Sequence, residues 1–406
     1  MDKLLICLLV LVFVIGSVCG VFYLLNEKNA VEMAEYIDTF REQRVDPTWG
    51  ASLDKYGNVY FTVDDAKDFK IMHLTDIHLS GGFLNRENDK KAINAVAAMV
   101  SAENPDLVIV TGDIAYAIGI HGTINNKYAH DMFIRLMENL GVYWTVAFGN
   151  HDTEPYNYYK RAQVAEWYAD ESLERCVFRH SPEGVDGEGN HLINIVNREG
   201  RVDVSLFMID SHSYIRQGLI GGMIDSLAWN YDSIKESQVE WYAEMMELYN
   251  PTSSAMFFHI PLREVKRGYD EFISAGRQDT ENVTWLDGRD GEEGDVVVYA
   301  SEVEDNLFEK IEEIGKPCSM FFGHDHFNNF VMDFRGVLFS YGYSVDYIAY
   351  GDIGAKGYQR GCTLINLAAG DRTVDFVDIV HENYYQDKYT SLYPKESVDM
   401  YPYFDK

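Results

Sequence analysis

The sequence contains few cysteines, and they are not arranged in pairs. Five cysteines occur in 406 residues. Cys7 and Cys19 lie in an apolar N-terminal run, whereas Cys176, Cys318 and Cys362 are scattered and form no CxxC motif. This number and spacing exclude a disulfide-stapled domain and favour buried structural thiols.

Basic side chains are also scarce. The chain has 34 Lys and Arg against 65 Asp and Glu, which gives a formal net charge of −31. Because binding to nucleic-acid polymers depends on Lys and Arg contacts to phosphates, such a partner is excluded. A small anionic substrate remains compatible, since bound cations can dominate the local field inside a cleft.

A long uncharged run opens the chain. Residues 4–25 contain no charged side chain, and as a helix they would span about 33 Å, enough to cross a bilayer. We therefore expect residues 1–25 to form an uncleaved signal anchor, with a cleaved signal peptide ending near Val18-Cys19-Gly20 as the alternative. The flanking charges, Lys3 and Lys28, slightly favour an extracytoplasmic catalytic domain at the cell membrane, or a secreted one.

The remaining chain divides by composition. Residues 26–67 are polar and predict a linker with a short hairpin, and residues 68–380 alternate short apolar runs with amphipathic segments, which is typical of an α/β domain. The acidic, glycine-containing segment 277–294 is expected to be a surface insertion. Residues 381–406 are rich in tyrosine and are interpreted as a C-terminal tail laid over the domain.

Five predicted strands end in polar clusters. The strands are expected at 69–74, 106–110, 143–148, 254–258 and 318–322, and further strands at 336–341, 361–367 and 373–379 predict a second sheet. Helical patterns lie at 89–102, 131–140 and 234–249. Loops at the carboxyl ends of strands are where ligands bind in open α/β folds, so these clusters predict one site.

The polar clusters contain side chains that ligate metals. The predicted ligands are Asp76, His78, Asp113, Asn150, His259, His324 and His326. Mixed oxygen and imidazole ligands suit Fe, Mn or Zn, and seven ligands are enough for two ions that share one carboxylate. Two cations about 3.5–4 Å apart can clamp a phosphate and lower the pKa of bound water towards ~7.

Two residues beside Asn150 are candidate catalytic groups. His151 is predicted to stabilise the phosphoryl charge or to protonate the leaving oxygen. Asp152 is predicted to orient His151, with a helix-capping role as the alternative. Arg263 is a candidate substrate contact, because a guanidinium group suits a phosphate.

The ordered motifs resemble those of the calcineurin-like metallophosphoesterase superfamily. These motifs are DxH at 76–78, GD at 112–113, GNHD at 149–152, a lone His259 after an apolar strand, and GHxH at 323–326. The resemblance implies a four-layer α/β/β/α sandwich of two mixed sheets. It also implies that Asp76, His78, Asp113 and His326 hold one metal, and that Asp113, Asn150, His259 and His324 hold the other.

Within the superfamily, the chain resembles the purple-acid-phosphatase-29-like branch. The segments that carry this likeness are 257–262, 323–329 and 341–351. Purple acid phosphatases replace the first-motif histidine and use the tyrosine of GDxxY as a ligand, whereas this chain has both His78 and Tyr116. We predict that His78 ligates and that Tyr116 does not.

The resemblance implies a dinuclear-metal-dependent phosphoester hydrolase, either a phosphatase or a phosphodiesterase. We expect a small or lipid-linked phosphate outside the cytoplasm as its substrate. A nucleotide or cyclic-nucleotide hydrolase is one alternative, because function belongs to the site rather than to the fold. A non-catalytic module that binds metal or phosphate is the other. The sequence indicates a membrane contact through the N-terminal helix and gives no indication of oligomeric state.

Overall fold

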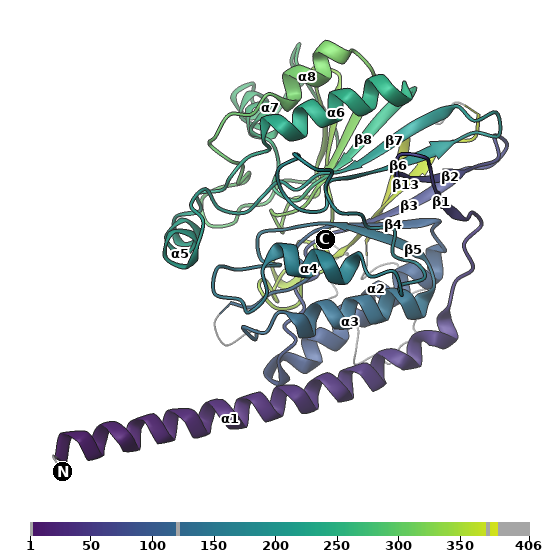
Figure 1. Ribbon diagram of the computed structural model, residues 1–406. Coiled ribbons are helices and arrows are strands. Elements are labelled where there is room, and N and C mark those ends of the chain that lie inside the picture. The colour runs from purple at the N-terminus through teal and green to yellow at the C-terminus, as the bar shows by residue number, and fades with distance from the viewer. Residues whose placement is uncertain (1–2, 119–121, 371–373, 381–406) are drawn as a thin grey trace.

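Two β-sheets pack face to face in the computed structural model, which describes residues 3–118, 122–370 and 374–380 (Figure 1). The larger sheet has nine strands. In spatial order they are β1 (Ala51–Leu53), β2 (Val59–Thr62), β6 (His191–Val196), β7 (Val202–Met208), β8 (Ser253–Phe257), β10 (Cys318–Phe322), β12 (Val337–Tyr341), β11 (Val331–Phe334) and β9 (Val283–Asp287).

The smaller sheet has five strands. In spatial order they are β14 (Val374–Val380), β13 (Gly361–Leu367), β3 (Phe69–Leu74), β4 (Leu107–Thr111) and β5 (Tyr143–Ala147). Strands β3, β4 and β5 run parallel, and so do β7, β8, β10 and β12 in the larger sheet. The loops after these parallel strands therefore gather at one edge of each sheet.

Helices cover both outer faces (Figure 1). The smaller sheet is covered by α2 (Arg86–Glu103), α3 (Lys127–Leu140) and α4 (Arg161–Tyr168), and the larger sheet by α6 (Glu236–Tyr249), α7 (Arg263–Ser274) and α8 (Leu307–Ile314). The expected four-layer α/β/β/α sandwich is therefore confirmed.

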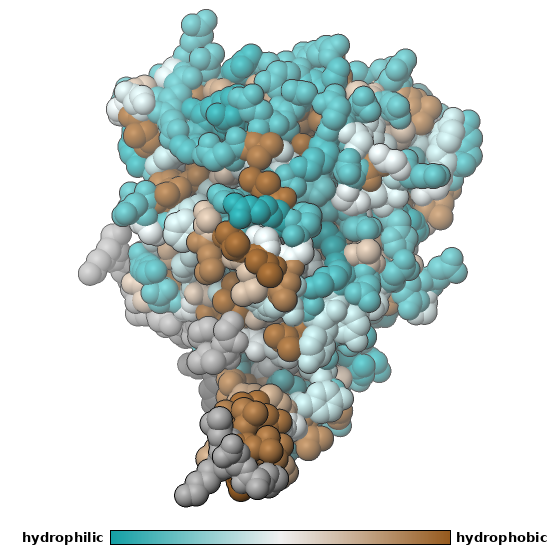
Figure 2. Space-filling model, turned by 60° about the vertical axis from the view of Figure 1, so that its left-hand side comes forward, coloured by the Kyte–Doolittle hydropathy of each residue, from teal (hydrophilic) through white to brown (hydrophobic). Residues whose placement is uncertain are grey.

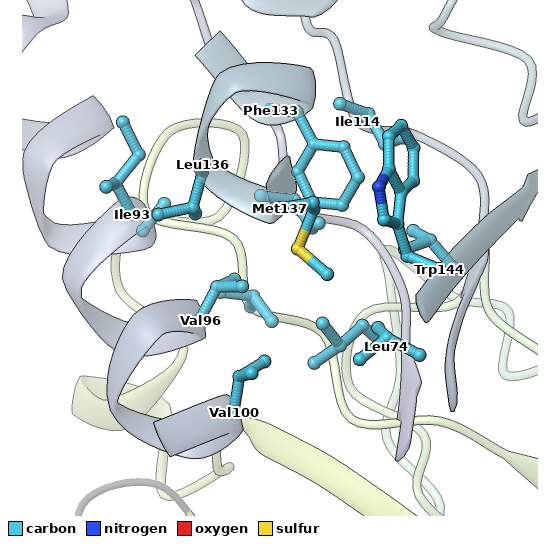
Figure 3. Packing of buried hydrophobic residues seen from close by; sticks show 14 of the residues in the cluster. Leu74, Ile93, Val96, Val100, Ile114, Phe133, Leu136, Met137 and Trp144 are labelled. Atoms are coloured by element: carbon cyan, nitrogen blue, oxygen red, sulfur yellow. The ribbon is translucent and has the colours of Figure 1, made fainter. Parts of the chain in front are cut away.

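Apolar cores between the sheets and under the helices hold these layers together. The core between the sheets is built from both of them, for example from Ile71 and Ile109 of the smaller sheet and Phe257 and Phe321 of the larger one. The core under α2 and α3 is shown in Figure 3, where Val96 and Phe133 point towards the sheet. Because the sheets are covered on both faces, their strands are nearly continuous apolar runs rather than alternating ones.

The N-terminal helix α1 (Lys3–Asp38) is longer than expected. Its first part is exposed and apolar, and it is long and apolar enough to cross a membrane. Its second part packs on α2 and α3, with Met33 and Ile37 fully buried. The start of the expected linker at 26–67 is thus helical and docked, whereas the expected hairpin is present as β1 and β2.

The segment 277–294, expected to be a surface insertion, contributes the edge strand β9 and a buried carboxylate, Glu293. The tail at 381–406 lies outside the described residues.

Candidate metal centre

All seven predicted ligands come together where the two sheets meet. They lie on the loops that follow β3, β4, β5, β8 and β10, and each side chain is at most 7% exposed. The two sheets touch here through a bridge between Thr75 and Ser344, and His324 donates its backbone N–H to Asp76 Oδ2 at 3.1 Å. The side chains predicted from the strand ends therefore lie in one cluster, and their role as metal ligands stays a prediction.

The carboxylate of Asp113 occupies the middle of the cluster. Its Oδ2 lies 3.3 Å from His78 Nε2 and 3.1 Å from His259 Nε2. Its Oδ1 accepts a hydrogen bond of 2.8 Å from the backbone N–H of His151. One carboxylate thus faces imidazoles from both sheets, as a shared ligand requires.

Two groups of ligand atoms extend from this carboxylate. On one side, His259 Nε2 lies 3.1 Å from Asn150 Oδ1 and 3.3 Å from His324 Nδ1. On the other side, Asp76, His78 and His326 place one ligand atom each within 4.8 Å of one another. Asp76, Asp113 and His259 satisfy the same criterion, so Asp76 reaches towards both groups.

Several buried polar atoms in the cluster have no hydrogen-bond partner. They are Asp76 Oδ1, His78 Nδ1, His324 Nε2 and His326 Nε2. Leaving a buried polar atom unpaired costs about 1–3 kcal/mol. Two of these atoms, Asp76 Oδ1 and His326 Nε2, lie 3.5 Å apart and fit a centre whose partners are cations rather than protein groups.

The backbone of the cluster is held in an unusual conformation. Asp76, His78, Asp113 and His324 have φ between 49° and 79°, in the left-handed region. That region costs a non-glycine residue roughly 1–3 kcal/mol, and such residues concentrate at functional sites. The close approach also requires Gly149, where an added Cβ would lie 2.1 Å from Asp113 Oδ1.

The electrostatics of the cluster follow from burial and from the shared carboxylate. Burial disfavours a charged His259, but the neighbouring Asp113 raises the pKa of this imidazole to about 9. Burial and the adjacent His259 together lower the pKa of His324 well below its usual value. Protons and cations therefore compete for the imidazole of His259. Cation binding should release the proton that this imidazole otherwise holds.

Two carboxylates that the sequence did not indicate contact the ligating histidines from outside the cluster. His78 Nδ1 lies 3.4 Å from Asp346 Oδ1, and His326 Nδ1 lies 3.0 Å from Glu293 Oε1. Burial opposes ionisation of Asp346, yet His78 keeps the pKa of this carboxyl below its usual range. Carboxylates of this kind fix the orientation of ligating histidines.

His151 lies beside the cluster, and its ring is held by a different acid from the expected one. Its Nδ1 lies 2.6 Å from Glu154 Oε1, and the Glu154 side chain is fully buried. Asp152 instead accepts hydrogen bonds from the backbone N–H groups of Asp113 and Gly149 at 3.1 and 2.8 Å. The orienting contact predicted for Asp152 is therefore wrong, because its carboxylate clamps two ligand loops together.

The remaining candidates from the sequence are Tyr116 and Arg263. The ring of Tyr116 stacks on His78, with centroids 4.8 Å apart, and its predicted non-ligand role stays a prediction. Arg263 begins α7 and pairs with Glu304 at 2.8 Å. Arg263 is not among the described residues that line the cleft over the cluster, so the expected substrate contact has no support from the geometry.

The cleft above the cluster has a volume of about 530 Å³. His151, His324 and His326 form its floor, and most of its wall is aromatic or apolar. The remaining described lining residues are Tyr116, Ile118, Tyr156, Tyr214, Met223, Ser226, Leu227, Trp229, Tyr231, Glu293, Tyr299, Ala349 and Tyr350. None of these described residues is Lys or Arg. The negative charge of a bound phosphate would therefore be neutralised by cations and by His151.

The chain is similar in sequence to known phosphoesterases. The family model of the calcineurin-like phosphoesterases matches residues 69–354. The chain is 26% identical over 335 residues to "Probable inactive purple acid phosphatase 28" of Arabidopsis thaliana, an alignment that covers 74% of this chain and 76% of that protein. It is 25% identical over 326 residues to "Probable inactive purple acid phosphatase 29" of the same plant, covering 72% and 76%.

Among solved structures, a dimetal phosphatase from Danio rerio is similar, with a TM-score of 0.41 and 12% identity. That similarity covers 77% of this chain and 99% of the zebrafish chain.

Proposed function

Because the chain belongs to the calcineurin-like phosphoesterase family, a family of dinuclear-metal-dependent hydrolases, we propose that it hydrolyses phosphate esters at the seven-residue cluster. The single observation that carries the proposal is the position of Asp113. Its Oδ2 lies within 3.3 Å of imidazole nitrogens from two different sheets. A carboxylate there can bridge two ions, whereas a structural ion pair would need only one histidine.

The ligands divide into two sets around Asp113. Asp76, His78 and His326 would complete one site with it, and Asn150, His259 and His324 would complete the other. Bound there, two cations of the Fe, Mn or Zn type would neutralise the phosphate charge and make water a competent nucleophile near neutral pH.

His151 is proposed as the proton donor to the leaving oxygen. Its Nδ1 is occupied by Glu154, so Nε2 is the ring atom left to serve the cleft that His151 lines. The carboxylate fixes the orientation of the ring, so that Nε2 can donate a proton to a group bound in the cleft.

The exposed apolar part of α1 supports a location at a membrane. We propose that α1 anchors the protein and that the catalytic domain lies outside the cytoplasm. Protease treatment of intact cells should release an active soluble domain, and protection from the protease would reverse this orientation.

The direct test is hydrolysis of p-nitrophenyl phosphate and bis-p-nitrophenyl phosphate by the full chain. Both esters are assayed with added Mn²⁺ and again after chelation. Turnover that disappears with chelation and returns with metal supports the proposal, and the preferred ester separates phosphatase from phosphodiesterase. His151→Asn should keep the metals and lose most of kcat, and an unchanged kcat would contradict its role.

A nucleotide hydrolase is a second candidate, because aromatic side chains such as Tyr231 and Tyr299 line the cleft and can stack on a base. A substrate panel that includes nucleoside monophosphates and cyclic nucleotides separates this candidate from the first. A non-catalytic metal- or phosphate-binding module is the third candidate, because both Arabidopsis relatives carry "inactive" in their names. Metal binding without turnover of any ester would support it.

A further inference from the structure

Helix α5 (Leu219–Ala228) presents its apolar side to the outside of the molecule. Ile220 is 75% exposed and Leu227 is 83% exposed, and Met223 and Ile224 on the same face are also exposed. Positions 220, 223, 224 and 227 follow the spacing of one helical face. A surface helix of a water-soluble protein normally packs its apolar face against the core.

The inward face of α5 explains why the helix is oriented this way. Asp225 is buried, and its carboxylate accepts hydrogen bonds from Arg216 N at 2.6 Å and Asn230 Nδ2 at 3.1 Å. Gly222 lies so close to Pro155 that an added Cβ would be 2.6 Å from its ring. The polar side of the helix is thus fixed to the domain, and its apolar side is left without a protein partner in the described chain.

The apolar part of α1 projects on the same side of the molecule as α5. Figure 1 shows both helices extending from the body on that side, and Figure 2 brings this side forward, with apolar side chains at mid-height and the apolar start of α1 below them. Exposed apolar surface of this kind marks an interaction site.

No flexible spacer separates the apolar part of α1 from the domain. The helix is continuous from Lys3 to Asp38, and the Phe22 ring packs against the Phe83 ring at 5.3 Å. Asn26 accepts a hydrogen bond of 3.0 Å from the backbone N–H of Phe83. A bilayer that contains the apolar run must therefore lie directly against the domain, on the side that carries α5.

The apolar surface of α5 is continuous with the metal cleft. Met223 and Leu227 belong to both, and Trp229, which ends α5, lines the cleft together with His151 and His324. Tryptophan prefers the interface between water and lipid, because its ring is apolar and its N–H is polar. An acyl chain could therefore follow α5 from the bilayer while its phosphate reaches the metal ligands.

We propose that α5 lies in the interface of the bilayer that α1 crosses, and that the cleft hydrolyses a phosphate ester carried by a lipid of this bilayer. The substrate part rests on the proposed function. In that reaction the oxygen of water joins phosphorus, the bond between phosphorus and the lipid oxygen breaks, and the lipid alcohol leaves with a proton from His151. The wall of the cleft suits the apolar part of such a substrate, and cations held by the seven ligands would suit its phosphate.

The test uses the full chain in nanodiscs of neutral phosphatidylcholine that contain a small fraction of a lipid phosphate ester. Phosphatidic acid serves if the soluble assay identifies a monoesterase, and phosphatidylglycerol if it identifies a diesterase. The variant is Ile220→Asp with Ile224→Asp, because neither residue lines the cleft. The matched control is Leu248→Asp, an exposed leucine on α6. All these proteins keep α1, so membrane attachment itself does not change.

The double variant should hydrolyse the lipid at least about tenfold more slowly, because charged side chains are costly in a bilayer. Its turnover of the soluble ester should stay within about twofold of the unaltered protein, and Leu248→Asp should change neither rate. Bromine-labelled lipids should also quench the fluorescence of the unaltered protein more than that of Trp229→Phe.

Three results would overturn the inference. They are equal lipid turnover by the double variant and its control, no quenching that depends on Trp229, and a dimer that the double variant dissociates without any loss of lipid turnover. A protein that hydrolyses the soluble ester but not the lipid contradicts this inference alone. A protein that binds metal and hydrolyses neither contradicts the proposed function, and the quenching result still decides whether α5 lies in the bilayer.

Discussion

Replacement of Glu154 by glutamine tests how the cleft supplies a proton. The buried carboxylate holds His151 Nδ1 at 2.6 Å and is also 3.3 Å from the hydroxyl of Tyr214. Glutamine keeps a hydrogen-bond acceptor at nearly the same place but removes the charge. A hydrogen bond to a charged group contributes roughly 1.5–3 kcal/mol and a neutral one about 0.5–1.5 kcal/mol, so the loss is about 1–1.5 kcal/mol.

That loss corresponds to a decrease in kcat of about tenfold. The decrease should depend on the leaving group, because only a poor leaving group needs a proton from His151. We therefore expect Glu154→Gln to lose about tenfold in kcat on phenyl phosphate and clearly less on p-nitrophenyl phosphate, whose leaving group is stable as an anion.

The assay measures kcat and KM for both esters, with metal content determined on the same samples. The KM values and the two metal ions should remain close to those of the unaltered protein. An equal loss on both esters, or no loss on either, would refute the assignment of Glu154 and His151 as the proton-donating pair. Loss of metal would show instead that Glu154 supports the ligand loops.

Three further predictions concern residues around the ligands. Asp152→Asn should lower the free energy of unfolding by about 2–5 kcal/mol, because backbone N–H groups of the ligand loops lose an acceptor. An unchanged midpoint in a denaturant titration would contradict the role of Asp152 in joining these loops. Burial raises the pKa of Asp89 from 3.8 to about 7, so the folded protein holds a proton that the unfolded chain releases between these values. Stability should then fall by up to about 4 kcal/mol as pH rises from about 4 to 7, and Asp89→Asn should flatten this dependence when unfolding is measured across that range. Iron-loaded protein should show no tyrosinate charge-transfer band in its visible spectrum, and a band that Tyr116→Phe removes would make Tyr116 a ligand.

The sequence predicted those parts of the site that depend on local pattern. Each ligand lies in the loop just after a short apolar strand. Because the carboxyl ends of parallel strands meet at one edge, the convergence of Asp76, Asp113 and His259 was predictable. The layers of the sandwich followed from the same motifs, through the resemblance of the chain to a known family.

The supporting residues were not predictable in this way. Glu293 lies in an acidic segment and Asp346 follows a late strand, so their contacts to His326 and His78 depend on the packing of distant loops. Glu154 is three residues from His151, but Asp152 is closer in sequence and equally acidic, and only the turn after β5 decides between them.

The end of α1 and the exposure of α5 were also not predictable from local pattern. Charged residues after Leu25 indicated a linker, yet Met33 and Ile37 continue the helix and are buried against α2 and α3. This continuation has a helical spacing of apolar side chains, but its partner surface is formed by residues far along the chain. The exposure of the apolar face of α5 was not predictable for the same reason, since the sequence of an apolar helix indicates burial and only its neighbours show whether it is covered.

The central claim is that the seven clustered side chains hold two cations through the shared carboxylate of Asp113. Elemental analysis of the purified, metal-reconstituted full chain tests it most directly, with Asp113→Asn measured beside it and both proteins shown to be folded. The account predicts two metal ions per chain in the unaltered protein and a loss of tight binding at both positions in the variant. No more than trace metal in the unaltered protein, or two ions retained by Asp113→Asn, would contradict it.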